Sequence, residues 1–95
     1  MLDLKGTKVI ELENGENLLL NYFLMSKKSV EVPGNVYGIC VEKELSGEKE
    51  ADQVENISYI EGNVMDILHT LMEHTVTPIC LAEVLDDLMT ERICG

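Results

Sequence analysis

Asn17-Leu18-Leu19-Leu20-Asn21-Tyr22-Phe23-Leu24-Met25-Ser26, residues 17–26, is the stretch that decides the fold. Taken as a β-strand, it is apolar on both faces, because its even and its odd positions each carry large hydrophobic side chains. A strand wetted on one side alternates between apolar and polar residues. This strand is therefore predicted at the centre of a sheet that is covered on both faces.

A hairpin is predicted to join the central strand to an earlier strand at residues 7–12. The connection is a three-residue loop, 13–15, with Gly15 in the left-handed conformation of a bulged turn. This loop places Ile10 opposite Leu18 and so keeps apolar residues opposite apolar ones.

Two further strands are predicted downstream. The Val-Pro-Gly sequence at 32–34 marks a turn, because proline presets φ and glycine tolerates positive φ. A strand over 35–45 follows, and residues 46–52 have the composition of a solvated turn. A shorter strand over about 53–60 then closes an antiparallel meander of three or four strands.

The last third of the chain predicts two amphipathic helices, at about 63–74 and 78–93. Asn63 is expected to cap the first helix and Thr77 the second, with Pro78 at the first helical position. The short linker predicts a helical hairpin, packed antiparallel or at a steep angle. Apolar residues recur at helical spacing in both segments: Val64, Ile67, Leu68, Leu71 and Met72, then Leu81, Val84, Leu85 and Leu88.

Strands followed by helices indicate the α+β class, and a chain of 95 residues is long enough for one modest core. Residues 1–95 are therefore predicted to form a single domain with the helical hairpin on one face of the sheet. The hairpin is expected to cover the even side of the central strand together with Ile10, Leu12, Tyr37, Ile39 and Val41.

The opposite face of the sheet then keeps an apolar set without a cover. A second copy of the chain is the favoured partner for this face, which predicts a homodimer, and a different protein partner is the alternative. The predicted interface residues are Leu19, Phe23, Met25, Val36 and Cys40.

Eighteen acidic and seven basic side chains give the chain a formal net charge of −11. Such a charge repels a phosphate backbone and argues against direct nucleic-acid binding, and it keeps a small protein soluble. An alternative function is that of an acidic antagonist, which presents its carboxylates to the basic groove of a nucleic-acid enzyme or regulator.

The cysteines Cys40, Cys80 and Cys94 are odd in number and far apart, which indicates neither a disulfide framework nor a zinc knuckle. Reduced thiols in a cytoplasm are expected. The longest apolar run, 18–25, is too short for a membrane span, and acidic residues precede it where a signal peptide would be basic. A cytoplasmic protein without membrane attachment is the prediction.

No catalytic constellation, cofactor motif or metal cluster is predicted. Asp66, His69 and Glu73 share one helical face, but the second helix offers no histidine, so a solvent-exposed face is the favoured interpretation. Cys40 is interpreted as a small core hydrophobe, and Cys80 is the better candidate for a reactive thiol. A non-enzymatic interaction or regulatory module is the first hypothesis, and a small hydrolase or metal-dependent enzyme is the least favoured.

Three short segments carry a resemblance to a known family: Tyr37-Gly38-Ile39, Ile57-Ser58, and Thr77-Pro78 running through Leu81, Val84 and Asp87. They resemble small uncharacterised proteins of clostridia and related Firmicutes, which form a domain of unknown function. The likeness covers about residues 20–90. It implies a cytoplasmic bacterial protein and carries no activity, ligand or catalytic residue.

Overall fold

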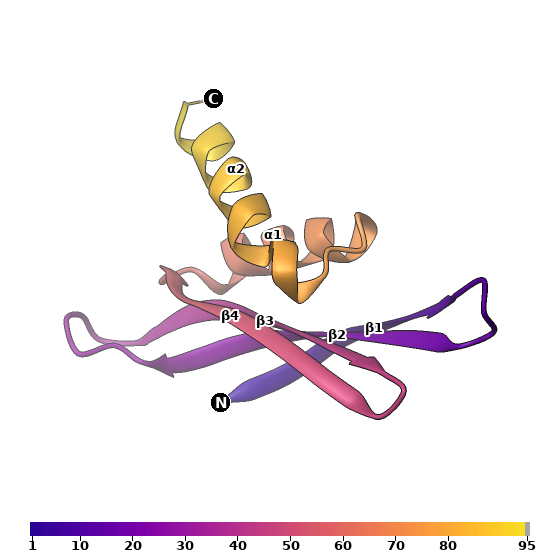
Figure 1. Ribbon diagram of the computed structural model, residues 1–95. Coiled ribbons are helices and arrows are strands. Elements are labelled where there is room, and N and C mark those ends of the chain that lie inside the picture. The colour runs from indigo at the N-terminus through magenta and orange to yellow at the C-terminus, as the bar shows by residue number, and fades with distance from the viewer. Residues whose placement is uncertain (95) are drawn as a thin grey trace.

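The computed structural model describes residues 1–94, with side chains described through Leu88. Over this range an antiparallel sheet in the order β1-β2-β3-β4 is followed by two α-helices with a short 3-10 helix between them (Figure 1). The predicted α+β class is therefore confirmed. The elements are β1 Leu2–Glu11, β2 Asn17–Lys28, β3 Asn35–Leu45, β4 Glu48–Ser58, α1 Glu61–Glu73, η1 Pro78–Cys80 and α2 Leu81–Cys94.

The predicted central strand is β2, which pairs with β1 on one side and with β3 on the other. The three-residue loop before it is confirmed, because Gly15 has a φ of 88° and Ile10 lies opposite Leu18. The register places the even residues of β2 beside the odd residues of β3, so Tyr22 lies opposite Val41 on one face. Both side chains are fully buried.

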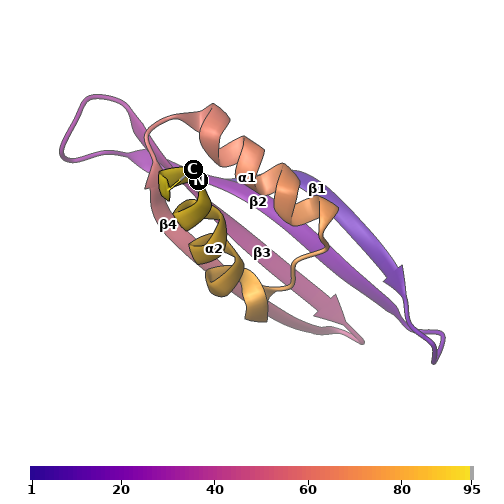
Figure 2. The same ribbon diagram turned by 90° about the horizontal axis from the view of Figure 1, so that it is seen from above.

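Both helices lie on that face of the sheet (Figure 1). Seen from above, α1 runs along the sheet over the β1 and β2 side, and α2 stands over the β3 and β4 side (Figure 2). Sheet and helices share one core, because apolar side chains of all these layers are buried together. Its members are Leu20, Tyr22, Leu24, Ile39, Val41, Val64, Ile67, Leu68, Leu71, Val76, Leu81 and Leu85.

The helices meet at a steep angle, the second of the two predicted arrangements. The start of α2 lies close to the sheet, and the helix then rises away from it (Figure 1). Leu81 and Leu85 are buried, whereas Val84 and Leu88 are half-buried. Val84 and Leu88 also pack against the core, so α2 supplies core contacts along the whole part whose side chains are described.

Two strands are longer than predicted. β1 begins at Leu2 instead of residue 7, and β4 begins at Glu48, inside the stretch predicted to be a solvated turn. Ser46 and Gly47 alone form the β3–β4 turn, and both have positive φ, which matches a tight two-residue hairpin. The start of β4 shows no apolar alternation because almost every side chain in it is exposed.

The predicted caps are wrong in detail. α1 begins at Glu61, so Ile60 occupies the N-cap position and Asn63 lies inside the first turn. Thr77 does occupy the N-cap position of η1, with Pro78 following, but its side chain makes no capping hydrogen bond. Within residues 1–94, no helix has the length and apolar character needed to cross a lipid bilayer.

Candidate functional site

The face of the sheet that carries no helix is the candidate site, and we call it the open face. It consists of the odd residues of β2 and of the strand positions that pair with them. All five predicted interface residues lie on it. Its side chains are Leu2, Leu4, Thr7, Val9 and Glu11 of β1, Asn17, Leu19, Asn21, Phe23, Met25 and Lys27 of β2, and Val36, Cys40, Glu42 and Glu44 of β3.

The predicted interface residues differ in exposure. Leu19, Phe23 and Met25 are half-buried, whereas Val36 and Cys40 are only 7% and 6% exposed. The last two therefore lie on the predicted face but are already covered by their own chain.

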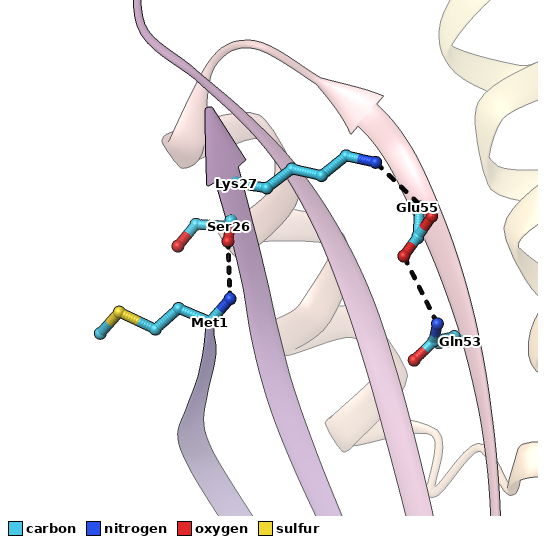
Figure 3. A network of polar contacts seen from close by, with 5 residues as sticks. All are labelled: Met1, Ser26, Lys27, Gln53 and Glu55. Atoms are coloured by element: carbon cyan, nitrogen blue, oxygen red, sulfur yellow. Dashed lines mark hydrogen bonds and ion pairs between the residues drawn. The ribbon is translucent and has the colours of Figure 1, made fainter. Parts of the chain in front are cut away.

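A polar bridge between β2 and β4 crosses β3 on this face. Figure 3 shows the Lys27 side chain reaching from the end of β2 across the sheet toward Glu55 on β4, and its Nζ lies 3.6 Å from Glu55 Oε2. Lys27 lies directly opposite Val36 in the β2–β3 register. Gln53 Nε2 donates to Glu55 Oε1 at 3.5 Å on the β4 side. We call Lys27, Gln53 and Glu55 the strap.

The backbone of β4 closes the same region. The β3–β4 register shifts between Tyr37 and Ile39, and the Val54 carbonyl lies so near Gly38 that a Cβ there would overlap it. Only glycine permits this approach of two strands. Around Val36 and Gly38, the open face is therefore covered by the chain itself.

The β1 and β2 side stays accessible. Leu2, Leu4 and Val9 are 53%, 53% and 62% exposed. Each lies directly opposite a predicted interface residue, in the pairs Leu2 with Met25, Leu4 with Phe23 and Val9 with Leu19. These six residues, which we call the apolar strip, lie on one face of two neighbouring strands, in two groups on either side of Thr7 and Asn21.

The sequence did not reveal the β1 half of the apolar strip. An irregularity in the pairing between Leu4 and Gly6 makes Lys5 an extra residue, so the even positions Leu2 and Leu4 share the face of the odd position Val9. The alternation of Leu2 and Leu4 with charged neighbours was the available signal. Without the bulge, this alternation would place Leu2 and Leu4 on the face of the sheet opposite to that of Val9.

A hydrogen-bonded polar row crosses the apolar strip. Thr7 Oγ1 donates to Asn21 Oδ1 at 2.8 Å, and Asn21 Nδ2 donates to Glu42 Oε1 at 3.1 Å. Thr7 and Asn21 lie in register between the pair formed by Leu4 and Phe23 and the pair formed by Val9 and Leu19. We call Thr7, Asn21 and Glu42 the polar row.

The cysteines do not form a reactive centre in the described part of the chain. Burial raises the pKa of the Cys40 thiol, and the carboxylates of Glu42 and Asp52 raise it further, so the thiolate is disfavoured. Cys80 is exposed and lies in the short 3-10 helix, whereas the sequence predicted it in the first turn of a long α-helix. The side chain of Cys94 lies outside the described residues.

The three residues of the helical face that was weighed as a metal site lie on a solvated surface. Asp66, His69 and Glu73 are all exposed on α1. No group of three or more metal-binding side chains converges within the described residues.

Two hollows adjoin the strap. One of about 100 Å³ lies beside Met1 and Met25, and one of about 440 Å³ lies at the β2–β3 hairpin beside Lys28 and Tyr59. The residues that line them include neither a histidine nor a cysteine.

Comparison with known proteins yields a family and no further relative. No curated protein and no solved structure gives a significant match to the chain. A family model described as "Family of unknown function (DUF6514)" matches residues 1–91, which is almost the whole sequence. The protein therefore belongs to the DUF6514 family.

Proposed function

We propose that this protein is a non-enzymatic interaction module that associates with a second copy of itself through the apolar strip. The observation that carries the proposal is the pairing of three exposed apolar side chains of β1 with three half-buried ones of β2, on a face that no helix covers. An exposed apolar patch of a few hundred Å² is often a functional contact surface. Covering the strip removes that surface from solvent.

A second copy suits the strip because the strip complements itself. Both halves are apolar, so two copies related by a two-fold axis bury like against like, as isologous dimers do. The carboxylates Glu42 and Glu44 lie on β3, beside the strip and outside it. Association through β1 and β2 therefore brings together the part of the open face with the least negative charge.

The size of the strip predicts a weak dimer. The strip spans residues 2–9 of β1 and 19–25 of β2, which gives a flat footprint of about 240 Å² per copy at ordinary strand spacing and rise. Standard interfaces bury about 800 Å² per partner, and smaller ones belong to transient complexes. Association should therefore depend on concentration in the micromolar range.

The cytoplasm of a bacterial cell is the proposed setting. The exposed Cys80 and the unpaired Cys40 favour a reducing compartment. The likeness in sequence to small clostridial proteins supports the bacterial origin.

Static light scattering tests the proposal. At about 50 µM, in the range where small interfaces associate, the wild-type protein should approach twice its chain mass of 10.6 kDa. Phe23→Glu should return a monomer with an unchanged circular dichroism spectrum, because an unpaired carboxylate then lies in the apolar strip. Val30→Glu is the matched control, since Val30 is fully exposed on the β2–β3 loop, and it should remain dimeric.

If the wild-type protein is monomeric at this concentration, the proposal is wrong. Equal dissociation of Phe23→Glu and Val30→Glu would also defeat it, because the added charge would then act regardless of position.

A further inference from the structure

We infer that the polar row sets the packing of the two copies, with the two-fold axis running along the strands between β1 and β2, so that β1 of each copy covers β2 of the other. This inference rests on the proposed self-association and adds its geometry. It assigns a contact to every residue of the apolar strip and a role to Thr7 and Asn21.

The pairing in the sheet shows why this axis matches the strip to itself. An axis along the strands keeps each cross-strand row at its own level and exchanges β1 with β2. Leu4 of one copy then meets Phe23 of the other, and Val9 meets Leu19, which are the pairs already found side by side within one chain. The exposed residues of β1 are thus covered by the larger side chains of β2.

With this axis, the polar rows of the two copies also face each other. Within one chain, the Asn21 amide uses one N–H toward Glu42 and one carbonyl lone pair toward Thr7. One N–H of the Asn21 amide and the acceptor lone pairs of the Thr7 hydroxyl remain for a partner. With β1 over β2, Asn21 of each copy faces Thr7 of the other, so two reciprocal hydrogen bonds complete the row.

An axis across the strands gives a poorer match. If it passed through the polar row, it would place Leu4 against Val9, Phe23 against Leu19 and Glu42 against its own copy. Two carboxylates facing each other in a dehydrated interface repel strongly. With the axis along the strands, Glu42 and Glu44 on β3 project past the edge of the other sheet.

The polar row therefore fixes the alignment of the two sheets along the strand direction. Sliding one sheet along the other would place Asn21 against leucine or valine and leave its remaining N–H without a partner, which a dehydrated interface disfavours. A single buried asparagine fixes alignment in coiled coils for the same reason. Face-to-face sheets about 10 Å apart leave room for the side chains of both rows to meet.

Charge complementation tests the axis. Leu4→Lys and Phe23→Glu, each prepared alone, should be monomeric. An equimolar mixture should form a heterodimer, because the introduced ammonium group of one chain faces the introduced carboxylate of the other, while the second contact between Leu4 and Phe23 keeps its native residues. In sedimentation equilibrium, association in the mixture should be at least about tenfold stronger than in either variant alone, which corresponds to one new ion pair at a partly buried position.

The matched control mixes Leu4→Lys with Val9→Glu. It carries the same charges, but these residues face each other only if the axis runs across the strands, so this mixture should stay monomeric. Leu2→Lys with Met25→Glu is a second pair for the axis along the strands, and it serves if Phe23→Glu fails to fold.

The outcomes separate the two levels of the claim. A monomeric wild-type protein overturns the proposed function and this inference with it. A dimeric wild-type protein whose Leu4→Lys variant is rescued by Val9→Glu, or by neither variant, overturns the axis and leaves self-association standing.

Discussion

Tyr22 joins the sheet to the segment between the helices through a single atom. The side chain is fully buried, and its hydroxyl donates to the Val76 carbonyl at 2.9 Å. This bond satisfies the only polar atom of the side chain and ties the α1–η1 connection to the middle of β2. The tyrosine thus combines a large apolar surface with one positional contact.

Tyr22 also predicts a loss of stability in alkali. Burial raises the pKa of Tyr22 to about 12 from its ordinary value of 10.0, so the folded state holds a proton that the unfolded state releases first. Below about pH 10, the neutral Tyr22 side chain makes its full contribution to the free energy of unfolding. As the pH rises from about 10 to 12, the free energy of unfolding falls by roughly 2–3 kcal/mol in total.

Urea denaturation of wild type and Tyr22→Phe from about pH 8 to pH 11 measures this loss. Tyr22→Phe should cost about 1–3 kcal/mol near neutral pH, because the buried Val76 carbonyl loses its donor, and its stability should fall less steeply in alkali. Tyr59→Phe, at a half-exposed position, should follow the wild-type curve. Parallel curves for wild type and Tyr22→Phe would contradict the assignment.

Two glycines test how closely the strands and helices approach. A Cβ at Gly38 would overlap the backbone carbonyl of Val54, whereas one at Gly6 would meet only the flexible end of the Met72 side chain. Gly38→Ala should therefore cost about 1–3 kcal/mol, and Gly6→Ala should stay within about 0.5 kcal/mol because methionine readjusts. Chemical denaturation measures both, and equal effects would show that the β3–β4 approach is not tight.

At the scale of elements, the two edge strands of the sheet differ in character. β4 begins with Glu48, Lys49 and Glu50, and nearly all of its side chains are exposed. Dense charge along an edge discourages the addition of another strand. β1 carries exposed leucine and valine on the open face instead, which favours the proposed association on the β1 side.

The attachment of α2 depends on its first turns. Leu85 is 2% exposed and belongs to the core, while the helix beyond it rises away from the sheet (Figure 1). Leu85→Ala should therefore cost about 2–5 kcal/mol, a large share of the 5–15 kcal/mol typical of a small domain. Asp86→Ala, on the exposed side of the same turn, should change the free energy of unfolding by less than about 0.5 kcal/mol. Equal midpoints for the two variants in urea would mean that α2 is not docked through Leu85.

At the scale of the whole molecule, net charge opposes the dimer that the apolar strip favours. Each copy carries a formal charge of −11, so two copies repel each other through water. Raising the salt concentration from about 0.01 to 0.3 M shortens the screening length from about 30 Å to well below 10 Å. The dimer should therefore tighten with salt.

Light scattering over a concentration series at each salt level measures this dependence. Weakening with salt would indicate that association relies on opposite charges, and it would contradict an apolar contact between like-charged copies.

Local periodicity alone determined most of the fold. The two-sided apolar pattern of residues 17–26 identified the central strand, and the spacing of Val64, Ile67 and Leu71 identified α1. Both are visible in the sequence because residues that share a buried face recur at short, regular intervals along the chain. The same pattern identified Leu19, Phe23 and Met25 as surplus to the helical cover. Each of these inferences spans only a few residues of chain.

Tertiary structure decided which part of the open face stays accessible. Lys5 reverses the alternation of β1, and Lys27 meets Glu55 across β3, so the accessible strip lies on β1 and β2 while Val36 and Cys40 are covered. The polar row joins residues 14 and 21 positions apart. Such contacts depend on strand register and on bulges, which arise from the packing of all four strands together and leave no repeating mark in the sequence.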